Sequence, residues 1–453
     1  MKLEKLPILP LTLLAAPFAL FAQTLQIDPS FYPIIEAISP DRLEADVQTL
    51  ANFGTRHTMS ETDSDTRGIG AARRWIKAEF EAISADHDNA YEVHEQRTLV
   101  TADPDSRIDR DTEIVNIYAI KRGSVYPNRY IIMSGDIDSR VSDVMNYTDD
   151  SPGANDNATG MAAAIELARV LADRDFPCSI LLAGLSGEEQ GLFGGKHLAE
   201  KAKSEGWEII GVLNNDMIGN IEGIDGVIDN RSFRIFSEPY YSNTTEREFQ
   251  LKRFYGGEND GESRQLARYV HATTQAYLPE LKPMLIYRLD RFGRGGHHRP
   301  FNEAGFPGIR IMETHENYNR QHQDLRIENG ITYGDTIDGV DFDYCAKLTA
   351  VNAIALAALA SAPLAPANVQ IGGIVQADTT LRWQAKDDPH IAGYKVYWRD
   401  TTSPIWQYAR LVGKTDSHTL KGIVIDNYLF GVSAIGSDGH ESVVTYPSSI
   451  IRD

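Results

Sequence analysis

Six acidic side chains stand just after predicted strands or in a turn between predicted elements: Asp136, Asp138, Asp156, Glu188, Glu189 and Asp216. In an open α/β sheet the carboxyl ends of the strands line one crevice, so these side chains are expected to converge. Several buried carboxylates would repel one another, and a cation relieves that repulsion. Any one of them alone could be a helix N-cap or a solvated loop end. Their placement after successive strands instead favours a metal site.

The elements expected to position these residues alternate β-rich runs with helical patterns over about residues 92–360. This alternation predicts an α/β domain, spanning residues 23–362, with a mixed, largely parallel central sheet flanked by helices. Strands are predicted at residues 116–121, 129–138, 179–187, 209–219 and 308–313. Helices are predicted at residues 67–84, 158–173, 194–202 and 346–362, where apolar residues recur at helical spacing.

The end of the chain changes to short predicted strands alone. The stretch "PLAPA", residues 363–367, predicts a linker because its prolines interrupt regular structure. Residues 368–453 then alternate aromatic and apolar residues with turn residues, which predicts a small all-β sandwich. This tail resembles a fibronectin type III domain, on the segments "LRW", "GYKVYWRD" and "DNYLFGVSAIGSDGHES". Such a domain could contact a cell surface or a polymer.

The first 22 residues have the pattern of an export signal. Lys2 and Lys5 give a positive start, and the apolar run after them ends at Ala22, a small residue at a suitable cleavage point. The run is short and contains three prolines, which favours a cleaved leader over a membrane anchor. No later segment is expected to span a membrane. We therefore expect a secreted or periplasmic protein.

Charge and cysteine content exclude some classes of protein. The 453-residue chain has 64 acidic and 44 basic residues, a formal net charge of -20. This charge would repel a phosphate backbone, so nucleic acid is not an expected partner. Cys178 and Cys345 are the only cysteines. Their apolar neighbours favour a packing role, although the two could pair in an oxidising compartment.

Six segments together resemble one enzyme family: "SGDIDSR", "PGANDNATG", "LSGEEQGLFGG", "NNDMIGN", "RGGHHRPF" and "ENYNRQHQD". They have the order and approximate spacing found in metallopeptidase family twenty-eight, whose members include bacterial leucyl aminopeptidases, glutamate carboxypeptidases and glutaminyl cyclases. The resemblance covers roughly residues 45–360. It implies a zinc-dependent exopeptidase that acts on peptides, and it favours an aminopeptidase; the leader pattern adds that the enzyme is exported.

The resemblance also implies roles at individual positions. Asp156 would bridge two zinc ions, and Glu189 and His322 would complete the shell of the first ion. Glu188, which is not a ligand, would be the general base that takes a proton from a water acidified by the metal and returns it to the departing amine. Asp138 stands where the family orients its first ligand without binding the metal.

The second metal position departs from the family pattern. Asp136, Asp156 and Asp216 would hold this ion, but most members have histidine at the position of Asp136 and aspartate at that of His297. A site of oxygen ligands alone admits manganese, magnesium or calcium more readily than a site with an imidazole. A single-zinc site, as in glutaminyl cyclases, is the alternative. His297 could also do no more than hold a turn.

Three functions remain open at this point: an aminopeptidase, a single-zinc acyltransferase similar to glutaminyl cyclases, and a non-catalytic metal-containing binding protein. The unligated Glu188 argues against the last, because a structural metal needs no base. Candidate substrate contacts are Arg291, Arg294 and Tyr318. The two arginines could receive a substrate carboxylate, or they could be solvated loop cations.

Overall fold

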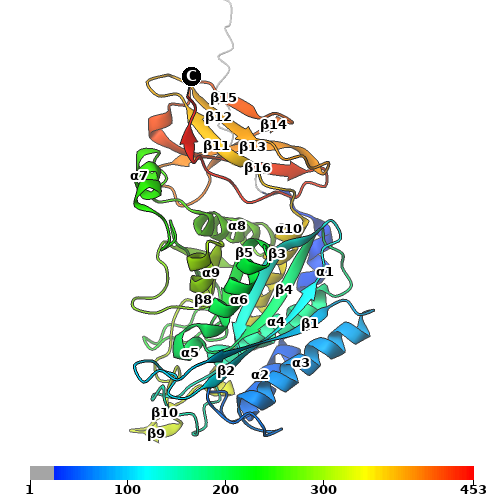
Figure 1. The fold of residues 1–453 in the computed structure, drawn as a ribbon, viewed down its shortest axis with the longest axis vertical. Helices are drawn as coiled ribbons and strands as arrows, with labels where there is room; N and C mark the ends of the chain where they lie inside the picture. The colour runs from blue at the N-terminus through cyan, green and yellow to red at the C-terminus, as the bar shows by residue number, and fades with distance from the viewer. Residues whose placement is uncertain (1–24, 453) are drawn as a thin grey trace, which may run out of the picture.

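A computed structural model describes residues 25–452 and shows an α/β domain with a smaller all-β part packed against one end of it (Figure 1). The predicted export signal at residues 1–22 lies outside the described residues. The boundary between the two parts falls after α10 (Phe342–Ser361), close to the predicted linker.

An eight-stranded mixed sheet forms the centre of the α/β domain, in the order β1-β2-β4-β3-β5-β8-β6-β7. Four of its seven neighbouring pairs are parallel: β3–β4, β3–β5, β5–β8 and β6–β7. The mixed, largely parallel sheet is therefore confirmed. Its strands are β1 (Glu92–Val100), β2 (Thr112–Lys121), β3 (Tyr126–Asp136), β4 (Cys178–Leu185), β5 (Glu208–Asn215), β6 (Ser232–Phe236), β7 (Lys282–Ile286) and β8 (Gly308–Glu313).

Helices cover both faces of this sheet. One face carries α2, α3, α4, α8 and α10, and the other carries α6 and α9. Side chains of β3 alternate between the two cores: Ile131 and Met133 enter the first, and Ile132 enters the second. The remaining helices of the domain are α1 (Tyr32–Ala37), α2 (Pro40–Asn52), α3 (Gly68–Asp86), α4 (Thr159–Leu171), α5 (Glu188–Gly191), α6 (Phe193–Ser204), α7 (Glu246–Phe254), α8 (Glu262–Tyr277) and α9 (His298–Ala304).

Two features of the core are an apolar helix of membrane-spanning length and a pair of buried cysteines. Within residues 25–452, α10 alone has the length and composition of a membrane span, but most of it is buried against α2, α4 and α8. It is therefore a core helix. Cys178 and Cys345 are both buried and unpaired, so the packing interpretation of the cysteines is confirmed over the alternative of a disulfide.

The all-β part has two sheets that enclose their own core, which includes Trp383 and Tyr394. The sheet orders are β15-β12-β11-β17 and β14-β13-β16. Residues 441–447 make only isolated bridges to β16. The likeness to fibronectin type III stays a prediction. The strands are β11 (Ala367–Gly372), β12 (Thr379–Gln384), β13 (Ile391–Asp400), β14 (Tyr408–Gly413), β15 (Ser417–Leu420), β16 (Tyr428–Gly436) and β17 (Ser449–Ile450).

A buried ion-pair group joins the two parts of the molecule. Asp260 lies 2.6 Å from Arg268 of α8 and 2.7 Å from Arg399 of β13, measured between carboxylate oxygen and guanidinium nitrogen. All three side chains are almost fully buried. Tyr269 of α8 also donates a hydrogen bond to the backbone oxygen of Glu441. The all-β part is thus fixed to α8 by polar groups removed from water.

Candidate metal centre

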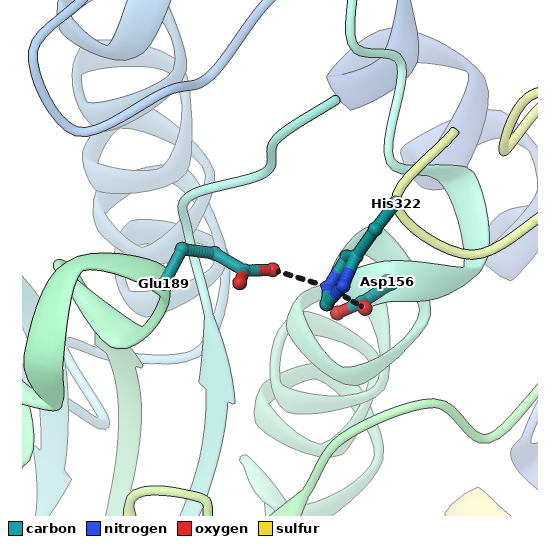
Figure 2. Close-up of side chains that lie close together, drawn as sticks. All are labelled: Asp156, Glu189 and His322. Atoms are coloured by element: carbon teal, nitrogen blue, oxygen red, sulfur yellow. Dashed lines mark hydrogen bonds and ion pairs between the residues drawn. The ribbon is translucent and has the colours of Figure 1, made fainter. Parts of the chain in front are cut away.

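Three side chains of metal-binding type meet beyond the carboxyl end of β4 (Figure 2). His322 Nε2 lies 2.9 Å from Asp156 Oδ2 and 2.8 Å from Glu189 Oε1. The two carboxylates are buried and the imidazole is partly exposed, so the cluster is reachable from solvent on one side. Two carboxylate oxygens and one imidazole nitrogen are a ligand set that zinc accepts, with room for a further ligand in a catalytic site.

The backbone around each of these residues is held in place. Asp156 lies in η2 (Ala154–Ala158), where the N–H groups of Asn155 and Asp156 donate to Asp335. Glu189 lies in the first turn of α5. His322 has a left-handed backbone conformation, with φ of 54°. Such conformations are uncommon outside glycine and concentrate at functional sites, because the surrounding structure must impose them.

The electrostatics of the cluster favour a cation at its centre. Burial alone would lower the pKa of His322, but Glu189 and Asp156 beside it raise that pKa to about 9. The protonated ring therefore places positive charge between the two carboxylates. A zinc ion held by the same three atoms would replace that proton with a larger charge, so the residues fit the metal.

Arg140 also contacts the cluster, and nothing in the sequence pattern singled it out except its place at the end of "SGDIDSR". Its Nε donates to Glu189 Oε2 at 2.8 Å, which leaves Oε1 facing His322. Its Nη2 lies 2.7 Å from His322 Nδ1. The guanidinium therefore orients Glu189 from outside the metal position.

Glu188 lies next to the cluster and is not part of it. Its carboxylate makes no hydrogen bond or ion pair with the residues that the structure describes. Burial raises its pKa well above the usual range, and the nearby charges of Glu189, Asp216 and Asp136 raise that pKa further. A carboxylate beside the metal cluster that has no protein partner is free to contact a water molecule, as a general base must.

Asp138 holds the turn that carries the two glutamates. Its Oδ1 accepts hydrogen bonds from the N–H groups of Gly187 and Glu188, at 2.8 and 3.2 Å, and its Oδ2 accepts one from Glu189 N–H at 3.1 Å. The hydroxyl of Thr58 donates to Oδ2 as well. The contacts of Asp138 thus go to the turn that carries Glu188 and Glu189, and it holds this turn without belonging to the metal cluster.

The two other predicted ligands lie outside the three-residue cluster. Asp136 Oδ2 accepts a hydrogen bond from Asn157 at 2.7 Å, and its Oδ1 lies 3.5 Å from His297 Nε2. Asp216 Oδ2 forms an ion pair with Arg310 Nη2 at 2.7 Å. The assignment of Asp136 and Asp216 as metal ligands therefore stays a prediction.

The candidate substrate contacts differ in how far they are engaged. Arg291 is paired with Glu316 at 2.7 Å, so its guanidinium is partly neutralised within the protein. Arg294 is exposed and reaches within 3.4 Å of His322 Nδ1. Tyr318 is 56% exposed. Of the three, Arg294 is the one that the structure brings directly to the metal cluster.

Comparison with known proteins places this chain in a family. The profile of peptidase family M28 matches residues 116–334. A probable zinc metalloprotease of Leptosphaeria maculans is 43% identical over 417 residues, which cover 91% of this chain and 96% of that protein. A probable zinc metalloprotease of Pyrenophora tritici-repentis is 40% identical over 423 residues, covering 93% of this chain and 87% of that protein.

A solved structure shares the fold. The LapA aminopeptidase of Legionella pneumophila superposes with a TM-score of 0.52 at 16% identity, over 75% of this chain and 77% of that chain. The sequence relatives extend over both the α/β domain and the all-β part, because they match more than nine-tenths of the chain. On these grounds, and with the zinc-compatible cluster at its centre, the chain belongs to peptidase family M28 and is a zinc metallopeptidase.

Proposed function

We propose that the protein is an exported aminopeptidase in which Glu188 is the general base. The observation that carries the proposal is the unpartnered carboxylate of Glu188 beside the cluster of Asp156, Glu189 and His322. Export is supported by the leader pattern of residues 1–22. The resemblance to exopeptidases of family M28 supports cleavage at a chain end.

The chain's own residues account for the proton transfers of peptide hydrolysis. Zinc bound by Asp156, Glu189 and His322 would supply Lewis acidity and lower the pKa of nearby water. Glu188 takes the proton of the attacking water and delivers it to the nitrogen of the leaving amine. Asp138 keeps Glu188 in place through the backbone of its turn.

The charge next to Glu188 supports recognition of a free α-ammonium group. Asp136 and Asp216 both raise the pKa of Glu188, so their charges lie close to it. Asp136 Oδ1 and Asp216 Oδ1 are buried and have no hydrogen-bond partner among the described residues. Asp216 is paired with Arg310, so Asp136 and Glu188 are the acidic groups here without a cationic partner in the described chain; they would stabilise a peptide N terminus and would repel a C-terminal carboxylate. We therefore place an aminopeptidase ahead of a carboxypeptidase.

The test uses one peptide in three forms: both termini free, the N terminus acetylated, and the C terminus amidated. Mass spectrometry of the zinc-loaded protein's products should show loss of the first residue from the free and amidated forms only. Cleavage of the acetylated form at its C terminus would contradict the proposal. A glutamine-initiated peptide that loses ammonia and keeps its first residue would instead indicate the acyltransferase alternative. Chelation followed by zinc addition is the control for metal dependence.

A further inference from the structure

We propose that Arg310 takes the place of a second metal ion, so that the protein holds one zinc per chain. This inference rests on the proposed metal centre at Asp156, Glu189 and His322. It concerns the neighbouring position, where the family resemblance implies a second ion bound by Asp136, Asp156 and Asp216.

Arg310 is a fully buried guanidinium in β8, within a strand whose residues are all buried. Its Nη2 forms an ion pair with Asp216 Oδ2 at 2.7 Å. Its Nη1 lies 3.0 and 2.9 Å from the two carboxylate oxygens of Asp290 and donates to the backbone oxygen of Gly295 at 2.7 Å. Asp290 is also buried, so this carboxylate holds Nη1 while Asp216 holds Nη2.

The ion pair with Arg310 changes what Asp216 can bind. An arginine stays charged in proteins, so Asp216 already faces a permanent cation. A divalent ion in contact with the same carboxylate would stand a few ångströms from the guanidinium, in a region shielded from water. The repulsion between the two positive charges would weaken its binding. Arg310 thus provides the positive charge that Asp216 needs.

The contacts of Asp136 also disfavour a second ion. His297 Nδ1 accepts the N–H of Gly195 at 3.1 Å, so the hydrogen of the neutral ring is on Nε2. That nitrogen faces Asp136 Oδ1 at 3.5 Å, while Asn157 donates to Asp136 Oδ2. Asp136 Oδ2 therefore accepts a hydrogen bond, while Oδ1 faces the N–H of His297 without forming one. His297 therefore presents no free lone pair toward this position. Although histidine and aspartate are exchanged between positions 136 and 297 relative to most family members, His297 does not supply the missing imidazole ligand.

The spacing of ligand atoms agrees with a single site. Asp156, Glu189 and His322 each place one ligand atom within 4.8 Å of the other two. Neither Asp136 nor Asp216 belongs to such a group of histidine, cysteine or acidic residues among residues 25–452. The cluster of Asp156, Glu189 and His322 lies beside the position that Arg310 occupies next to Asp216. Asp156 belongs to the cluster.

The test counts metal ions in the purified full-length protein. The protein is stripped with a chelator, loaded with excess zinc, manganese, magnesium or calcium, and desalted; the metal per chain is then measured by mass spectrometry. We expect one zinc ion to be retained and no second ion of any of the four metals. Asp216→Asn should still retain one zinc. Two retained ions in the parent protein, with one of them lost in Asp216→Asn, would overturn the proposal.

A variant without the guanidinium tests whether the charge of Arg310 is what excludes a second metal ion. Arg310→Met keeps an unbranched side chain and removes the guanidinium, so the second position should become able to retain an ion, visible as a second metal per chain and a further metal-dependent rise in Tm. Arg234→Met is the matched control and should stay at one ion. Arg234 lies in the adjacent strand β6, pairs with Glu316 and makes no ion pair with Asp216. A folded Arg310→Met protein that also stays at one ion would contradict exclusion by charge. If Arg310→Met does not fold, the counts for the parent protein and Asp216→Asn decide.

Failure of this inference is distinguishable from failure of the proposed function. A protein that retains one zinc and hydrolyses no peptide would contradict the aminopeptidase proposal and support the single-metal inference. A protein that retains two ions and releases N-terminal residues would contradict the single-metal inference and support the aminopeptidase proposal.

Discussion

Replacing Glu188 by glutamine tests the assignment of the general base. The substitution keeps the size of the side chain and removes its capacity to accept a proton. The Glu188 carboxylate has no hydrogen bond or ion pair with the described residues, so the change breaks no side-chain contact. The backbone N–H of residue 188 still donates to Asp138. We therefore expect the fold and the zinc content to be preserved.

The expected loss of turnover follows from what the side chain does. General-base assistance contributes roughly 10²- to 10⁴-fold to such reactions. At about 1.36 kcal/mol for each tenfold change, this corresponds to about 3 to 5 kcal/mol of transition-state stabilisation. The free energy of unfolding should not fall, because the substitution breaks no side-chain contact and removes a carboxylate that its acidic neighbours disfavour. The effect should fall on kcat, because Glu188 acts on the reacting proton.

The assay measures kcat, zinc per chain and Tm on the same preparations. Glu189→Gln is the matched control at the adjacent position, because Glu189 contacts His322 and Arg140 and should be needed to retain zinc. A Glu188→Gln protein that retains zinc and turns over within about threefold of the parent would remove Glu188 from the proton transfers, since the smallest expected effect is about a hundredfold. Loss of zinc from this variant would instead make Glu188 a ligand.

Four further predictions concern other parts of the structure. His322→Ala should lose tight zinc binding, measured as metal per chain, and with it the rise in Tm on zinc addition. Asp138→Asn should lower kcat about tenfold or more, because one of its acceptor oxygens becomes an NH2 group facing a backbone N–H. Burial raises the pKa of Glu313 to about 8, so the folded state keeps a proton that the unfolded chain releases; the free energy of unfolding should fall as pH rises from about 4.5 to about 8, and Glu313→Gln should flatten that part of a urea-unfolding profile. Arg399→Met should lower the free energy of unfolding by about 3 to 5 kcal/mol, because Asp260 loses one of its two buried partners.

Each of these predictions has an outcome that contradicts it. Undiminished zinc in His322→Ala would place the metal elsewhere. Parent-like kcat in Asp138→Asn would mean that the turn of Glu188 and Glu189 keeps its conformation without the hydrogen bonds to Asp138. An unchanged pH profile in Glu313→Gln would show that this carboxyl group is ionised in the folded protein at neutral pH. A Tm unchanged in Arg399→Met would mean that the all-β part is fixed by its apolar contacts alone.

Strands buried on both faces were the most predictable part of the fold. The strands β3, β4, β5 and β8 are continuous apolar runs because helices cover the sheet on each side. The sequence pattern did not indicate α8, although it is a helix of 16 residues. Arg264 and Arg268 are buried in it, since one side of α8 meets polar groups near the all-β part. These charged residues obscure the apolar repeat that would have indicated the helix.

The candidate site was predictable where ligands lie within motifs. Asp156, Glu189 and His322 come from three separate motifs, and the fold brings them together. The ion pair between Asp216 and Arg310 was not predictable, because it depends on the pairing of β5 with β8, in which Asn214 stands opposite Arg310. The one available signal was Arg310 inside the apolar run "GIRIME". An arginine is rarely buried without a partner, so this residue indicated an acidic group close to the strand.

Diffraction from crystals of the zinc-loaded protein, recorded on both sides of the zinc absorption edge, would locate the metal. We expect one strong anomalous peak in contact with Asp156, Glu189 and His322, with the Glu188 carboxylate free of the metal and Arg310 paired with Asp216. No peak among those three residues, or a peak that has Glu188 as a ligand, would contradict this expectation.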